Sequence, residues 1–203
     1  MATLSELIAD VYTITNRSDL VAETALAVKS ATLKAHRLDF FSRDLYETAY
    51  VFPTSLNKQT LDYITQISNF RALSYIRFYY DTNEVVTTID ATGPFADIVT
   101  PQEILDAYGY NRTNIAYVAG RNLEIRGSEA FTKILLGAYV FPIVTEVGFS
   151  SWVADLYPYV IVYEAARHIF ITIGKAEEAA RYGNLVAEEY STFIPAALAD
   201  QAY

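Results

Sequence analysis

The chain has 203 residues, of which 52% are hydrophobic and 19% charged, and its net charge is −9. This share of apolar residues supports a folded core and excludes a disordered chain. The 15 Lys and Arg residues are scattered from Arg17 to Arg181 without a cluster. Tight nucleic-acid binding is therefore not expected, because counterion release needs a basic face.

Residues 3 to 42 have the pattern of helices. Thr3 and Glu6 have the spacing of a capping box, in which each residue satisfies the backbone N–H of the other. Apolar residues then follow at helical spacing: Leu4, Leu7, Ile8 and Val11. We expect a second helix to begin at Asp19, because residues 20–38 contain neither Gly nor Pro.

Residues 43 to 147 change to an alternation of period two, which is typical of strands. We expect a strand over 43–52 that stops at Pro53, and a short strand over 60–64. The aromatic-rich stretch 70–80 is expected to be the strongest strand, with alternate residues on opposite faces.

The second half of this zone holds a short helix and two further strands. Thr100 is expected to cap a helix over 101–107, with Pro101 at its first position. Residues 115–126 have the pattern of a hairpin that turns at 119–122. Residues 133–144 form another expected strand, in which the glycine at position 137 indicates a bulge.

The last zone returns to helix. Asp155 is expected to cap a helix that has Pro158 near its first turn. Residues 159–173 are apolar nearly all round, which predicts a buried central helix or an oligomer contact. A final helix is expected over 175–194, and Pro195 should end or bend it.

These elements predict an α+β fold. Helices from both chain ends, residues 1–42 and 148–194, would form a bundle of about four helices. An antiparallel β-rich region, residues 43–147, would be inserted between them, and residues 195–203 would form a C-terminal tail.

The composition offers few catalytic options. Cysteine is absent, so there is no disulfide, no thiolate nucleophile and no Cys-based zinc site. The start of the chain lacks the features of a signal peptide, and the longest apolar run, 134–144, is well below the roughly 20 residues of a membrane helix. We expect no cofactor, no membrane contact and no catalytic residue, although a hydrolase that uses two carboxylates remains an alternative.

The two histidines suggest one possible polar cluster. His36 is followed by Asp39, and Glu164 precedes His168 by one helical turn. If the two helices faced each other, these residues could hold a metal or perform acid–base chemistry. The spacing does not fit the Glu-x-x-His pattern of di-iron bundles. The other interpretation is a polar stripe that fixes helix packing, or simply solvated residues, and we expect no metal site.

Two features point to protein contacts. The chain has 17 tyrosines, which suit partly wet interfaces, although a small mixed fold could also use them in its strands. Four apolar residues lie in or near the C-terminal segment: Phe193, Ile194, Leu198 and Tyr203. They would either fray or form an arm that orders on a partner.

Four stretches of the chain resemble one family. They are the opening two-helix unit with Ala-x-x-x-Ala-Thr-x-x-x-His, the segment 69–76, the pair 122–126 and 136–142, and the segment from Ser151-Trp152 to Ile173-Gly174. Together they resemble the head-to-tail adaptors of tailed bacteriophages, also called connector or tail tubular proteins. The resemblance covers residues 3–194.

The resemblance implies a structural virion protein. Such adaptors combine a helical bundle with a β insert. They form a twelve-fold ring that docks on the portal protein. DNA passes through the lumen, tail or nozzle proteins attach below, and the C-terminal segment, here residues 191–203, often reaches the portal. The expected location is the neck of the virion, after synthesis in the host cytoplasm. Another neck or tail-completion protein is the alternative, and the net charge of −9 predicts a free protein that is monomeric or weakly associated.

Overall fold

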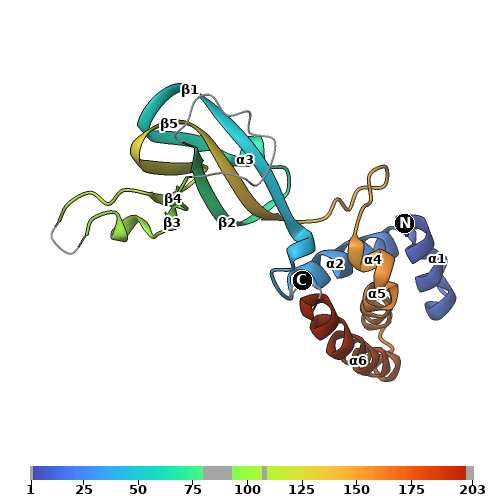
Figure 1. Cartoon of the computed structure of the whole chain (residues 1–203). Coiled ribbons are helices and arrows are strands. Elements are labelled where there is room, and N and C mark those ends of the chain that lie inside the picture. The colour runs from blue at the N-terminus through green and yellow to red at the C-terminus, as the bar shows by residue number, and fades with distance from the viewer. Residues whose placement is uncertain (1, 80–92, 107–108, 200–203) are drawn as a thin grey trace. The chain divides into compact units, whose positions relative to one another are not determined.

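The computed structural model describes residues 2–79, 93–106 and 109–199, and the chain forms two compact units (Figure 1). The helical unit comprises Met1–Asp44 and Phe141–Tyr203, and the sheet unit comprises Leu45–Val140. The expected α+β fold is confirmed. Figure 1 shows that helices from both ends of the chain gather in the helical unit, so the sheet unit is an insertion.

The helical unit contains two N-terminal and three C-terminal helices. They are α1 (Leu4–Thr15), α2 (Val21–His36), α4 (Trp152–Leu156), α5 (Pro158–Thr172) and α6 (Ala176–Ala199). The predicted capping box at α1 is present: the Thr3 hydroxyl accepts from the Glu6 N–H at 3.2 Å, and the Glu6 carboxylate accepts from the Thr3 N–H at 2.8 Å. No described helix is long and apolar enough to cross a membrane.

One predicted cap was wrong, and α2 begins two residues after Asp19, where we expected it to begin. Asp19 does not cap α2, because its carboxylate is bound by Arg17 at 2.7 Å and Leu20 occupies the cap position. Asp155 lies within α4 and accepts a hydrogen bond from the Ala2 N–H at 2.6 Å. The cap of α4 is Ser151, whose hydroxyl accepts from the Ala154 N–H.

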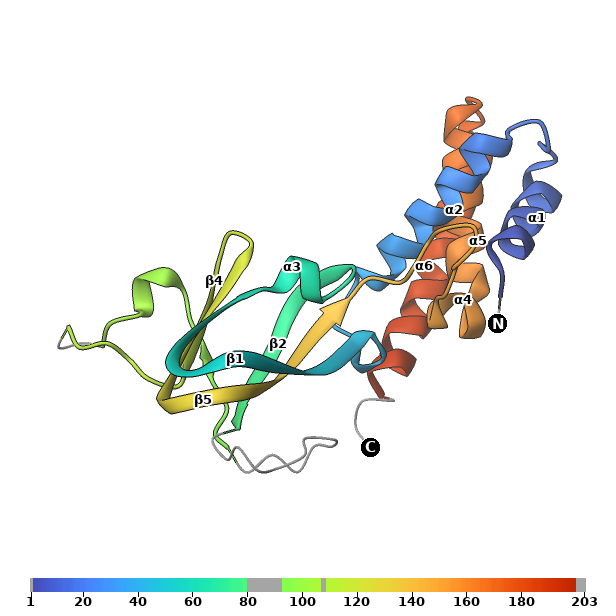
Figure 2. The ribbon, with the colours of Figure 1, turned by 90° about the horizontal axis from the view of Figure 1, so that it is seen from above.

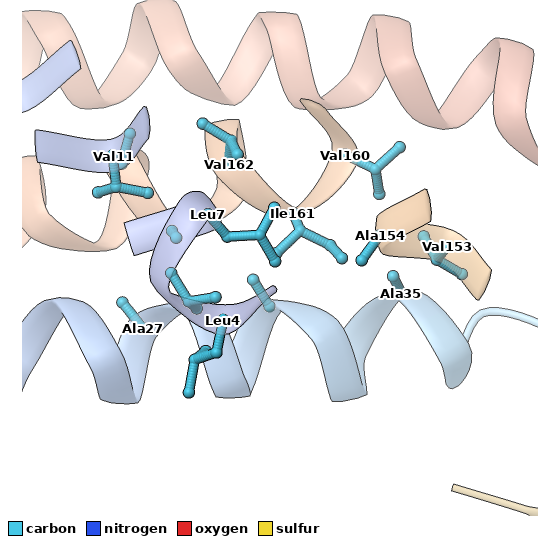
Figure 3. Packing of buried hydrophobic residues seen from close by; sticks show 14 of the residues in the cluster. Leu4, Leu7, Val11, Ala27, Ala35, Val153, Ala154, Val160, Ile161 and Val162 are labelled. Carbon is cyan, nitrogen blue, oxygen red and sulfur yellow. The ribbon is translucent and has the colours of Figure 1, made fainter. Parts of the chain in front are cut away.

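The central element of the helical unit is α5, as its apolar sequence predicted. It packs against α1, α2, α4 and α6. Its buried apolar residues are Val160, Ile161, Val162, Ala165, Ala166, Ile169 and Phe170. Figure 3 shows residues of α1, α2, α4 and α5 meeting in this core. Each large aliphatic side chain buried in this way contributes roughly 1.5–3 kcal/mol to folding.

The prediction of a separate tail from residue 195 was wrong. Helix α6 continues through Pro195 to Ala199. A proline inside a helix costs about 3 kcal/mol, because it lacks an N–H and clashes with the preceding turn. Burial on both sides of Pro195 offsets this cost, since Phe193 is fully buried and Ala197 is 5% exposed.

The sheet unit is organised around its longest strand. Its elements are β1 (Leu45–Asp62), the short helix α3 (Tyr63–Gln66), β2 (Phe70–Tyr79), β3 (Asp97–Ile98), β4 (Ile115–Ala119) and β5 (Asn122–Val140). Strand β5 pairs with β1 along one edge, and with β4 and then β2 along the other. Figure 2 shows the long curved course of β1 and β5.

We expected a purely antiparallel sheet, but the sheet is mixed. Strands β3 and β4 pair in parallel, through Asp97 with Ile115 and Ile98 with Ala116, whereas the other pairs are antiparallel. The expected hairpin between β4 and β5 is present, and Gly120 adopts φ 63° at its turn. The expected helix over 101–107 is reduced to one 3-10 turn, Pro101–Glu103, and position 107 lies outside the described residues.

Strand β1 passes through Pro53, where we expected it to stop. The β1–β5 register shifts between Val51, which pairs with Lys133, and Leu56, which pairs with Phe131. Pro53 lies in this irregular segment, so its missing N–H breaks no regular pair. The expected strand over 60–64 belongs to the end of β1, and from Tyr63 the chain turns into α3.

The bulge expected at Gly137 lies instead in the facing strand. Leu73 pairs with Ala138 and Tyr75 pairs with Gly137, so Ser74 is an extra residue in β2. This bulge breaks the predicted alternation, since Leu73 packs against the same core as Ile76. The ring of Tyr75 covers Gly137, and a Cβ there would lie 2.4 Å from its Cε1 atom.

We predict that Gly137→Ala lowers the free energy of unfolding by about 1–3 kcal/mol, because the added methyl group overpacks the site under Tyr75. Urea unfolding followed by circular dichroism would measure the change. In a Tyr75→Ala background the ring is absent, and the cost of Gly137→Ala should fall by at least about 1 kcal/mol. Equal costs in both backgrounds would contradict the explanation.

Candidate functional site

A buried polar network surrounds His36, the last residue of α2. The imidazole is 1% exposed, with Nδ1 2.8 Å from Asp44 Oδ1 and Nε2 3.0 Å from Ser151 Oγ. The Trp152 indole also donates to Asp44 Oδ1, at 2.7 Å. Nδ1–H donates to the carboxylate, and Nε2 shares a hydrogen bond with the Ser151 hydroxyl.

The order Ser151–His36–Asp44 is that of a nucleophilic catalytic triad. A nucleophile must reach a substrate, however, and both Ser151 and Asp44 are only 5% exposed. The Ser151 hydroxyl is also engaged as the cap of α4. The network therefore serves packing: it ties the end of α2 to the residue where the chain leaves the helical unit, Asp44, and to the start of α4.

Sequence reasoning missed this network. The hydrogen-bonded partners of His36 lie 8 and 115 residues away along the chain. We had paired His36 with Asp39, but Asp39 Oδ1 accepts from the Phe40 N–H at 2.7 Å. Of the four residues in the possible cluster, Glu164 and His168 lie 3.3 Å apart, and His36 contacts Asp44 and Ser151. Across the described ranges, no group of three His, Asp or Glu side chains could hold a metal ion.

Glu164 forms the second polar site of the helical unit. Its carboxylate is 1% exposed, and Oε1 lies 2.6 Å from Lys34 Nζ, 3.3 Å from His168 Nε2 and 3.4 Å from an Arg167 nitrogen. Removing the partners of a buried charge costs about 3–5 kcal/mol of folding free energy. These contacts therefore offset the cost of burying the carboxylate inside the bundle. This arrangement matches the alternative interpretation of a polar stripe that fixes helix packing.

Tyr190 of α6 lies beside this carboxylate. Its ring is 5.9 Å from Lys34 Nζ, and its buried hydroxyl has no hydrogen-bond partner among the described residues. Burial, followed by the negative charge of Glu164, raises the pKa of Tyr190 to about 12. The phenol is therefore held in its neutral form by the low dielectric of the helix interface.

The helical unit has a groove between α2 and α5. Its volume is about 240 Å³, and it is lined by Glu23, Leu26, Ala27, Ser30, His168, Ile169 and Thr172. The side chain of Leu26 is exposed to 69% although it is apolar. The groove is smaller than most ligand pockets, which exceed about 300 Å³, and it suits a few side chains of a protein partner.

The predicted partner-binding residues differ in accessibility. Phe193 is 0% exposed and its ring lies 5.3 Å from Phe41 and 5.1 Å from Tyr157, so it belongs to the core and cannot meet a partner. Ile194 is half-buried, and Leu198 is 37% exposed near the end of α6. Tyr203 lies outside the described residues.

The sequence matches no protein-family model and no curated protein. The likeness to phage adaptors therefore rests on the residues of this chain.

We predict that His36→Ala lowers the free energy of unfolding of the helical unit by about 2–4 kcal/mol, since it leaves Asp44 and Ser151 buried without their shared partner. Fluorescence of Trp152, the single tryptophan, would follow the unfolding. A fluorophosphonate that labels a control serine hydrolase should leave Ser151 unlabelled. Labelling of Ser151 that disappears in His36→Ala would instead identify a nucleophile.

The raised pKa of Tyr190 predicts a loss of stability in alkali. The phenol has a pKa near 10 in the unfolded chain and of about 12 in the folded protein. The contribution of Tyr190 to the free energy of unfolding is therefore fully present below pH 10 and is lost as the pH rises to 12. Tyr190→Phe should show a smaller loss between pH 10 and 12 in thermal unfolding. At neutral pH it should not be destabilised, because the hydroxyl it removes has no partner. Identical alkaline losses in both proteins would contradict this assignment.

Proposed function

We propose that this protein is a structural virion protein, the head-to-tail adaptor of a tailed bacteriophage. Copies form a ring, about twelve-fold, that docks on the portal protein and carries tail or nozzle proteins below. DNA passes through the lumen of this ring. The protein is made in the host cytoplasm and works in the neck of the virion.

The observation that carries the proposal is the insertion of the sheet unit into the helical unit. The chain leaves the helical unit after Asp44 and returns to it at Phe141. The family resemblance implies this combination of a helical bundle and a β insert. The residues that carry the resemblance lie in both units.

Charge supports the same proposal. A net charge of −9 keeps free copies apart and keeps passing DNA from adhering, because like charges repel. A ring of such copies needs a template that offsets the repulsion, and the portal supplies one. We therefore infer a monomer or weak oligomer in solution, which assembles on its partner.

Exposed apolar side chains on both units offer the contacts that assembly requires. Leu26 borders the α2–α5 groove, and Leu198 lies near the end of α6, where the family places its portal contact. The sheet unit exposes Val51, Leu56 and Ile98, which are available to neighbouring copies or tail proteins. Apolar residues of this kind form the centres of protein interfaces.

The test is binding of the tagged chain to the isolated portal ring of its phage. We expect Leu198→Ser to weaken portal binding by about tenfold or more, because it removes an apolar contact from the docking end of α6. The matched control is Leu156→Ser, which replaces a leucine of α4 that is 50% exposed. It should bind like the unchanged chain, and both variants should retain the Trp152 fluorescence of the folded protein.

The outcomes separate the alternatives. Equal weakening by both substitutions would contradict a specific contact at Leu198. A chain that binds tail proteins and not the portal would belong one layer further down, as a neck or tail-completion protein. A chain that binds neither would overturn the proposal.

A further inference from the structure

A hollow on the sheet unit gathers basic side chains in an acidic protein. Its volume is about 290 Å³, and it is lined by Asn57, Lys58, Asn111, Arg112, Thr113, Arg126 and Gly127. These residues come from β1, from β5 and from the segment that precedes β4. Three of them are cations and none is acidic, although the whole chain has 24 acidic and 15 basic residues.

Strand pairing forces two of these cations together. Lys58 of β1 lies directly opposite Arg126 of β5 in the antiparallel ladder, so both side chains emerge on the same face of the sheet. Like charges in directly opposed positions destabilise a sheet. A bound anion between the two side chains would remove this repulsion.

The charges of the hollow are incompletely balanced. Lys58 Nζ lies 3.4 Å from Glu124 Oε2, and Arg112 donates to Asp97 Oδ2 at 3.1 Å. Arg126 has no carboxylate partner among the described residues, and its Nη1 donates at 2.8 Å to the neutral Asn111 side chain. One positive charge therefore remains without an acidic counterpart in this part of the chain.

Arg126 also carries an unsatisfied donor. Its Nε atom is buried and has no hydrogen-bond partner in the described part of the chain. A buried donor without an acceptor costs free energy, and it costs more when the group is charged. The described residues therefore leave the Arg126 guanidinium only partly paired.

We propose that this hollow is a binding site for a small oxyanion of the phosphate class. Arg126 would present its guanidinium fork, which matches the oxygens of a phosphate group. Lys58 and Arg112 would add charge from two other directions, and the Asn57 amide and Thr113 hydroxyl would add neutral donors. The volume exceeds that of one phosphate ion and leaves room for the substituent of a phosphate monoester.

A small anion fits better than a nucleic acid. The site offers one uncompensated positive charge, whereas a polyanion would also meet the field of a chain with net charge −9. The proposal does not depend on the adaptor function, since it rests on the lining and the strand register of the sheet unit.

The test is a titration of the full chain with inorganic phosphate at constant ionic strength, followed by amide chemical shifts. Saturable shifts are expected at Gly127 and Thr113, which line the hollow. Arg126→Gln should weaken binding by about tenfold or more, because a charge-assisted bidentate contact is lost. The matched control is Arg121→Gln on the β4–β5 turn, where Arg121 pairs with Asp62 at 3.2 Å, and its affinity should stay within about twofold.

A second variant keeps the proposal testable if Arg126→Gln fails to fold. Lys58 is 54% exposed, so Lys58→Gln should fold normally and still weaken phosphate binding. If a nucleoside monophosphate competes with phosphate, the hollow accommodates the substituent of the ester, and a phosphate ester is a ligand. Shifts that do not saturate, or equal weakening by Arg121→Gln, would overturn the proposal. Tighter binding of an oligonucleotide than of either small anion would also overturn it.

Discussion

The burial of α5 is the constraint on which the helical unit depends. Most of this helix is apolar, so it is stable only when other helices cover most of its surface. Helices from both ends of the chain cover α5: α1 and α2 precede the sheet unit in the sequence, and α4 and α6 follow it. The two ends of the chain are therefore one folding unit, and the sheet unit is inserted between them without interrupting their core.

Buried polar groups add specificity to this apolar packing. His36, at the end of α2, contacts Asp44, the last residue before the sheet unit. It also contacts Ser151, which caps α4, the first helix after the sheet unit. Glu164 gives α5 a charged contact with Lys34 of α2. Because a buried charge or imidazole without its partners is costly, these contacts favour one register of the helices over others that would bury the same apolar area.

Each unit offers a different kind of surface. The helical unit exposes apolar residues, such as Leu26 beside the α2–α5 groove, which suit contacts with other protein subunits. The sheet unit concentrates cations around Arg126 in a chain that is otherwise acidic. The proposed role in the virion would account for the first surface, and the second is the surface for which we propose an anion site.

Local pattern by itself determined much of the fold. The change from helical spacing to alternation predicted the α+β class, the Thr3 capping box marked the start of α1, and the apolar stretch 159–173 predicted a central helix. These features depend on neighbours within a few residues, so the sequence contains them directly. Only tertiary structure decided the rest. Pro195 stays helical because distant residues bury its neighbours, and the partners of His36 are up to 115 residues away. Such pairings are set by which faces pack together, and that choice is a property of the whole fold.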